Sequence, residues 1–210
     1  MLEELHAEFD SRAERDLQQA LERTGLLLLG EVHGVAENAA VIYALFVRFG
    51  FRALALEWPA DVDLKATHRS EDGRVTREYF TLLRTLQAEE SLEQLILFDD
   101  PGDGTWGGRD AAMAARLLAA LQPGVPTLAV MGNLHSRTRS HRHGEPLGLH
   151  VARARPGVPE ARITYVGGGF YNFGTKRFRH WPLRRLRKPR FRRAGQLFVF
   201  ELPTATPASD

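Results

Sequence analysis

A short pattern, Gly-x-x-His, occurs twice in this sequence. The first copy runs from Gly30 to His33 and the second from Gly132 to His135. Each follows an apolar stretch, and a glycine there lets the chain turn so that the histidine points back over the end of that stretch. Glu31 lies inside the first copy. Imidazole and carboxylate groups together can act as a general base with its orienting partner, or can hold a divalent metal.

Polar side chains also follow two other apolar runs. Glu57 closes the segment RALALE at 52–57 and is followed by Trp58, and Asp99 and Asp100 follow QLILF at 94–98. Trp58 is a candidate wall of a substrate pocket. Tyr171, which follows a run of three glycines, is a candidate hydrogen-bond donor to substrate.

The elements that must position these groups alternate between helix and strand. Apolar residues three or four apart predict helices over 2–21, 35–49 and 107–121, and the polar segment 61–88 is expected to be mostly helical. Short apolar runs predict strands over 26–29, 52–57, 94–98, 127–131, 163–166 and, at a sheet edge, 196–202. The segments 136–159 and 174–194 are expected to be long connections. This alternation predicts an α/β fold with a mostly parallel central sheet of about six strands, flanked by helices on both faces.

Ligands of open α/β sheets bind outside the carboxyl ends of the strands. Four consecutive predicted strands end in polar groups, so we expect one site that contains Glu31, His33, Glu57 and His135. These four residues could hold a divalent metal such as Mn, Co or Zn, or could move protons without a metal.

The order of these motifs resembles the opening of the erythromycin esterase, Tiki, TraB and ChaN-like superfamily. That superfamily typically shows Gly-Glu-x-His-Gly, then a glutamate that ends the second strand, then a second Gly-x-x-His. The matching residues here are 30–34, Glu57 and 132–135, and Arg109-Asp110-Ala111-Ala112-Met113 is similar to the Arg-x-x-x-Met helix that precedes the second histidine. The resemblance spans residues 26–136.

The resemblance implies a hydrolase that activates water at this edge of the sheet to cleave an ester, lactone or amide bond of a small molecule or peptide. Glu31 and His33 would be the acid–base pair or the first metal ligands, Glu57 the second carboxylate, and His135 would complete the site. Arg109 would bind substrate or stabilise an oxyanion, a task that its fixed fork suits. The esterases imply His33 as general base without a cofactor, and the Tiki proteases imply a divalent metal. Asp99 or Asp100 would match an acidic position after the third strand.

Two other functions stay open. The same histidines could bind haem or a metal without turnover, as in ChaN-like proteins. Alternatively, residues 176–193, with ten Lys/Arg and no acid, could contact a nucleic acid or an anionic surface. The rest of the chain is acidic, so we expect this strip to pack on the body through aromatic residues such as Phe178, Trp181 and Phe191, and we do not expect a nucleic-acid partner.

Composition excludes several other classes. The 210 residues are expected to form a single domain with an Arg-rich loop at 174–194 and a short tail at 203–210. The absence of cysteine excludes disulfides, zinc ribbons, iron–sulfur clusters and cysteine nucleophiles. The sequence contains no Gly-x-Ser-x-Gly motif, so we do not expect a serine hydrolase of the α/β type. The longest apolar run has nine residues and the N-terminus is acidic, so we expect no membrane span, no signal peptide and a cytoplasmic protein.

Overall fold

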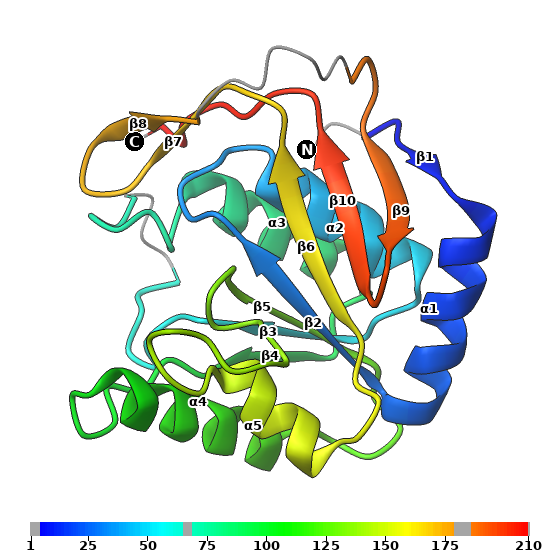
Figure 1. Cartoon of the computed structure of the whole chain (residues 1–210). Coiled ribbons are helices and arrows are strands. Elements are labelled where there is room, and N and C mark those ends of the chain that lie inside the picture. Colours follow the sequence, from blue (N-terminus) through cyan, green and yellow to red (C-terminus); the bar gives the residue numbers. More distant parts are fainter. Residues whose placement is uncertain (1–4, 65–68, 179–185, 210) are drawn as a thin grey trace.

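The computed structural model describes residues 5–64, 69–178 and 186–209 (Figure 1). Its helices are α1 (Ser11–Thr24), α2 (Asn38–Arg48), α3 (Arg77–Ala88), α4 (Trp106–Ala120) and α5 (Leu147–Ala154). Its strands are β1 (Glu8–Phe9), β2 (Leu26–Glu31), β3 (Ala53–Leu56), β4 (Gln94–Leu97), β5 (Thr127–Gly132), β6 (Glu160–Tyr165), β7 (Gly169–Tyr171), β8 (Thr175–Arg177), β9 (Arg190–Ala194) and β10 (Leu197–Leu202). In these described ranges, no helix has the length and apolar character that crossing a membrane requires.

Eight of the strands form one sheet in the order β1-β9-β10-β6-β2-β5-β3-β4. All neighbours in it are parallel except β9 and β10, while β7 and β8 form a separate antiparallel hairpin. The prediction of a mostly parallel α/β sheet with helices on both faces is therefore confirmed. The sheet is larger than the six strands expected, because β1 and β9 come from segments predicted as helix and loop.

The first helix is shorter than its periodicity predicts. It begins at Ser11 because the side chain of Asp10 caps it by accepting a hydrogen bond from the Ala13 amide at 2.7 Å, and it ends at Gly25 in the left-handed conformation. Residues Glu8 and Phe9, predicted as helix, instead pair with β9. Phe9 packs there against the ring of Phe191 at 5.5 Å between centroids, a long-range contact that outweighs local helix propensity.

Other assignments also differ from prediction. Within 61–88 only α3 is helical, starting behind Thr76, whose side chain accepts from the Tyr79 amide, and residues 65–68 lie outside the described ranges. Segment 136–159 contains α5, and segment 174–194 contains β8 and β9. Strand β10 is not an edge strand, because it pairs with β9 on one side and with β6 on the other.

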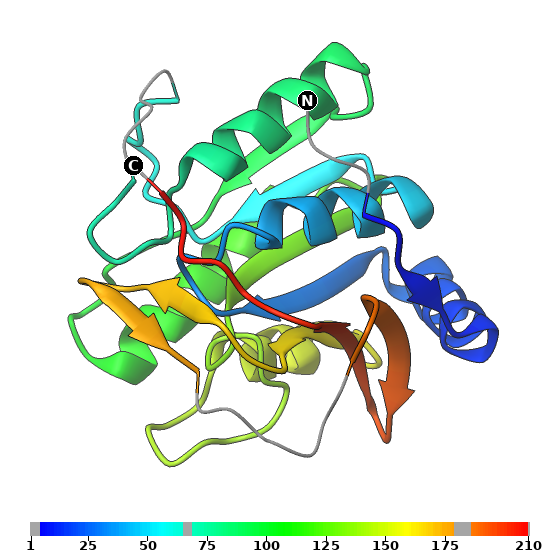
Figure 2. The ribbon, with the colours of Figure 1, turned by 90° about the horizontal axis from the view of Figure 1, so that it is seen from above.

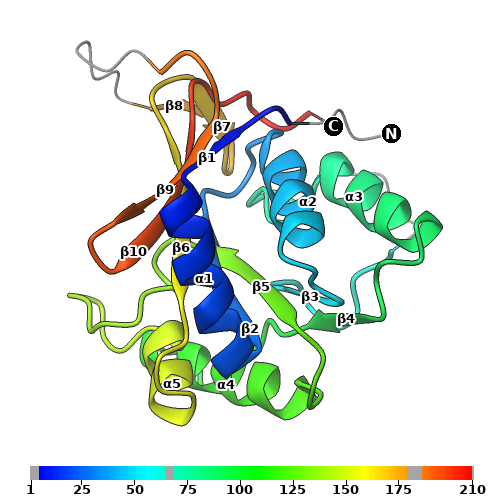
Figure 3. The same ribbon diagram turned by 90° about the vertical axis from the view of Figure 1, so that its right-hand side faces the viewer.

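The central strands are buried on both faces, and this fixes where their ends lie. Side chains alternate along β2, so that Leu27 and Leu29 join the core under α1, α2 and α3, while Leu26 and Leu28 join the core under α4 and α5. Figure 3 shows α2 and α3 on one side of the sheet and α4 on the other. A one-residue shift of β2 would exchange the two cores, so its carboxyl end is strongly specified.

Three segments that are distant in sequence meet behind His33. The carbonyl of Gly34 accepts hydrogen bonds from the amides of Tyr171 and Ala208, both at 2.9 Å, and the amide of Ala36 donates to the carbonyl of Thr206 at 2.9 Å. The residues predicted as a tail therefore run along the loop that follows His33 and beside the β7–β8 hairpin (Figure 2). This packing holds the loop from its outer side.

The Gly34→Ala protein is expected to lose about 2–4 kcal/mol of unfolding free energy in denaturant titrations. Gly34 has a positive φ of 72°, and a Cβ atom there would lie 1.9 Å from the carbonyl oxygen of Tyr171, a backbone atom that cannot move alone. Gly25→Ala is the matched control, since its φ is also positive at 65° but nothing lies within 4 Å of the added atom. Equal losses in the two proteins would show that the contact with Tyr171 contributes nothing.

Candidate active site

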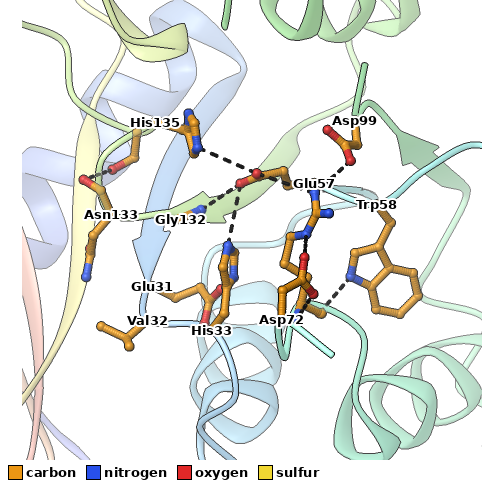
Figure 4. Close-up of polar contacts among 12 residues, drawn as sticks. Glu31, Val32, His33, Glu57, Trp58, Asp72, Asp99, Gly132, Asn133 and His135 are labelled. Carbon is orange, nitrogen blue, oxygen red and sulfur yellow. Dashed lines mark hydrogen bonds and ion pairs between the residues drawn. The ribbon is translucent and has the colours of Figure 1, made fainter. Parts of the chain in front are cut away.

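The first histidine is held by a buried carboxylate. Nδ1 of His33 is hydrogen-bonded to Oε1 of Glu31, the last residue of β2. The other oxygen of Glu31 accepts from the side-chain amide of Asn38 on α2, and the Asn38 carbonyl oxygen accepts from the hydroxyl of Tyr165 on β6. Glu31 is 3% exposed. Its fixed position turns Nε2 of His33 toward Glu57 (Figure 4).

Glu57 lies at the centre of the site. It follows β3, is buried, and accepts from the Gly132 amide at 2.9 Å and from Nη2 of Arg109 at 3.0 Å. Its oxygens lie 4.0 Å from Nε2 of His33 and 3.7 Å from Nε2 of His135. Burial raises the pKa of Glu57, but the charges of the two histidines, the Gly132 hydrogen bond and Arg109 outweigh it, so the pKa is lowered. Glu57 is therefore ionised at neutral pH.

The second histidine repeats the arrangement of the first. Nδ1 of His135 is hydrogen-bonded to Oδ1 of Asp110, a fully buried residue of α4. The indole of Trp106 stacks on the imidazole, with ring centroids 4.6 Å apart and planes 17° apart. Nη1 of Arg109 lies 3.4 Å from Nε2 of His135. Both histidines thus use Nδ1 for a carboxylate and turn Nε2 toward Glu57.

The glycines of the two Gly-x-x-His motifs are required for close packing. Neither has a positive φ, and both belong to strands. A Cβ on Gly30 would lie 2.3 Å from Oγ of Ser136, in the loop that follows His135. A Cβ on Gly132 would lie 3.1 Å from Nε2 of His33. We expected these glycines to permit a turn, and instead each one makes room for the neighbouring loop.

Two arginines and an aspartate surround this centre. Asp99 accepts from Nη2 of Arg109 and from Nη1 of Arg74, both at 2.6 Å, and Nη1 of Arg74 lies 3.7 Å from Glu57. Of the two aspartates considered after the third predicted strand, Asp99 is the one in the cluster, because Asp100 pairs with Arg116 at 2.9 Å.

The aromatic residues predicted to contact substrate lie at its border. Trp58 is 1% exposed, packs against Phe80, and donates its indole N–H to the Arg74 carbonyl at 2.9 Å. Trp58 thus supports Arg74, and it also lines the small cavity beside His33 and Glu57. Tyr171 is partly exposed, and the guanidinium of Arg69 covers its ring at 3.2 Å from the centroid.

Sequence reasoning missed Asp110 and Asn38 as parts of the site, although a signal was present. Asp110 lies on the same buried stripe of α4 as Met113, Ala114 and Leu117, at positions i, i+3, i+4 and i+7. Asn38 is likewise on the buried side of α2. A polar residue at an apolar position of a helical repeat needs a partner, and here the partners are His135 and Glu31. Arg74 comes from a loop and carries no such signal.

A small cavity lies at the centre of the site. A cavity of about 10 Å³ lies among Glu31, His33, Glu57 and Arg74, enough for about one water molecule. Among the residues that the structure describes, no three His, Asp or Glu side chains are arranged to hold a metal ion. The guanidinium of Arg109 already pairs with Glu57 at 3.0 Å, so this carboxylate has a cation beside it. The described residues around this cavity therefore do not fit a divalent metal, and a cavity of this size does not hold a haem macrocycle.

The unfolding free energy is expected to fall as pH rises from 6.5 to about 9. Burial lowers the pKa of His33, but the charge and hydrogen bond of Glu31 and the charge of Glu57 outweigh it and raise the pKa to about 9, above the ordinary 6.5 of an unfolded chain. The protonated ring therefore stabilises the fold fully below pH 6.5 and loses this effect through pH 9. Denaturant titrations at several pH values measure the slope, which should be smaller in His33→Gln. An identical slope in that variant would contradict the assignment.

These features define a class of fold: an open, mostly parallel α/β sheet with paired histidines and carboxylates at its carboxyl edge. No protein-family model and no curated protein sequence matches the chain. Among solved structures, the chain is similar to the erythromycin esterase EreC, in a histidine-to-asparagine mutant in its open conformation. The two are 15% identical, the match covers 95% of this chain and 80% of that chain, and the TM-score is 0.55. The erythromycin esterase-like fold that the sequence motifs imply is therefore confirmed.

Proposed function

We propose that this protein is a hydrolase that cleaves an ester, lactone or amide bond with His33 as the general base. One observation carries the proposal: two histidine–carboxylate pairs turn their Nε2 atoms toward the same ionised glutamate. A histidine whose Nδ1 donates to a carboxylate is held in the tautomer that can accept a proton at Nε2. The esterase-like fold supports the same class of reaction.

In the proposed reaction a water molecule loses a proton to Nε2 of His33 while its oxygen attacks the carbonyl carbon of the substrate. The small cavity beside His33 and Glu57 is of the size for such a water. Arg109 is the donor proposed for the oxyanion that forms, and it is kept in place by Asp99. His33 then returns the proton to the leaving oxygen or nitrogen. His135, fixed by Asp110, lies against Arg109 and positions it.

A panel of chromogenic esters, lactones and peptides, assayed with the full chain, tests the proposal. We expect the protein to hydrolyse at least one ester or lactone. A chelator should not change the rate, and elemental analysis should find less than one metal ion per chain. Because His33 must be unprotonated to act as a base, kcat/KM should rise with pH between 7 and about 9. A flat profile over this range would contradict His33 as the base.

The same panel, together with an absorption spectrum of the protein, separates this proposal from the metal-dependent and haem-binding alternatives. Activity that is lost with chelator and restored by Mn, Co or Zn would favour a metal held by Glu31, His33, Glu57 and His135. A Soret band without hydrolysis would favour a haem-binding protein.

The nucleic-acid alternative has less support, because several described residues of the strip 176–193 contact the body of the protein. Phe178 stacks on Tyr165, and Arg192 pairs with Glu201. Trp181 lies outside the described residues.

A further inference from the structure

A second and larger cavity, of about 360 Å³, lies apart from the candidate active site. It is bounded by the loop that follows β5, by the start of β6 and by the turn between β9 and β10. The loop lies on the same side of the sheet as α5 (Figure 1). Its lining residues are Arg137, Thr138, Arg139, Ser140, Glu160, Arg162, Ala194, Gln196 and Leu197. The size falls in the range of pockets that bind small molecules.

The charge of this cavity is positive, because its only carboxylate is already used. Oε1 of Glu160 accepts from Arg162, and Oε2 accepts from the amide and the hydroxyl of Thr138 at 3.1 and 3.0 Å. Glu160 thus balances Arg162 and has no oxygen directed at the other two arginines. Arg137 and Arg139 remain as a surplus of two positive charges on one wall.

The guanidinium of Arg137 is not fully hydrogen-bonded within the described part of the protein. Its Nε atom is buried and has no hydrogen-bond partner among the residues that the structure describes. Because Nε itself is buried, a ligand in the cavity would have to contact the terminal nitrogens of this guanidinium. A guanidinium fork fits the oxygens of a phosphate group. The hydroxyls of Thr138 and Ser140 and the side chain of Arg139, which donates to Gln196, lie on the same lining.

We propose that this cavity binds a small phosphate-bearing molecule, with Arg137 and Arg139 as the main donors to the phosphate oxygens. The volume of the cavity and the two surplus charges suit one or two phosphate groups. The neighbouring basic strand is less suited to a nucleic-acid backbone, because Arg190 and Arg192 both pair with Glu201. The site does not depend on the proposed hydrolysis, so its occupant is either an effector or a part of a substrate.

Calorimetric titration of the full chain with inorganic phosphate and with pyrophosphate, at constant ionic strength, tests the proposal. Pyrophosphate is expected to bind with one site per chain, and more tightly than phosphate. Arg137→Gln should weaken its binding about 10- to 100-fold, since a charge-assisted hydrogen bond is lost. Arg153→Gln is the matched control, because Arg153 pairs with Glu145 on the surface of α5 and does not line the cavity. This control should bind within about twofold of the unmodified chain, inside the small effect of a distant surface charge.

Arg139→Gln gives the same test at an exposed residue, so it serves if Arg137→Gln fails to fold. Three outcomes would overturn the proposal: no saturable binding up to about 10 mM pyrophosphate, equal weakening in Arg153→Gln, or unchanged affinity in the folded cavity variants. An oligonucleotide that binds more tightly than pyrophosphate and is unaffected by Arg137→Gln would also overturn it, and would point to nucleic acid on another surface. None of these readouts measures hydrolysis, so this proposal and the proposed function can fail separately.

Discussion

His33→Ala is expected to reduce kcat/KM for the best ester or lactone about 10²- to 10⁴-fold, the range for loss of a general base. The other imidazole nitrogen that faces Glu57, Nε2 of His135, lies 3.4 Å from Nη1 of Arg109, and this contact keeps it from taking over the role. Stability should fall by about 1–3 kcal/mol, because Glu31 loses its charged hydrogen-bond partner but keeps Asn38. The comparison of kcat/KM with a denaturant titration separates the two effects.

His6→Ala is the control, since His6 is exposed and precedes β1. The double variant His33→Ala, His135→Ala should be little worse than His33→Ala alone, because groups that act as one unit are strongly non-additive. If the two losses multiply instead, the histidines act independently. Full activity in His33→Ala would refute the proposed mechanism.

Glu57→Gln is expected to abolish measurable hydrolysis and to lower the unfolding free energy by about 2–4 kcal/mol. The neutral amide would leave the Arg109 guanidinium and the two imidazoles facing one another without the central charge. Removing one partner of a buried ion pair costs about 3–5 kcal/mol, and the loss here is smaller because Asp99 continues to pair with both arginines.

Glu201→Gln is the matched control for this variant. Glu201 is 2% exposed and also pairs with two arginines, Arg190 and Arg192, but it lies on β10, outside the candidate active site. The Glu201→Gln protein should therefore lose a similar amount of unfolding free energy. At a temperature where this variant is folded, its turnover should match that of the unmodified chain. Equal loss of turnover in both proteins would show that Glu57 acts only through stability.

The strand ends could be predicted from sequence because they depend on local patterns. An unbroken apolar run such as 26–29 needs burial on both faces, and in a parallel sheet this places the following polar residues at one edge. Glu31, His33, Glu57 and His135 follow such runs, and the structure brings them together. The roles of the two glycines could not be read in this way, because the atoms that a Cβ would meet belong to a loop a hundred residues away.

Other features depend on long-range contacts that no local pattern encodes. Strand β1 forms because Phe9 pairs with and packs against Phe191, which lies near the other end of the chain. Arg74 reaches the site because the loop before α3 folds over Trp58. Asp110 is an intermediate case. Its position on a buried helical stripe signals an internal partner, but only packing identifies that partner as His135.

The hydrogen bonds behind His33 join three chain segments into one unit of local stability. The amides of Ala36, Tyr171 and Ala208 each depend on a carbonyl from another of these segments. Such amides exchange with deuterium only when the segments separate, so their exchange rates should be nearly equal and should respond together to mild denaturant. The proposed base is thus carried on a loop whose opening is coupled to residues far away in the sequence. A change near residue 206 can therefore alter how long His33 stays in position without touching the site.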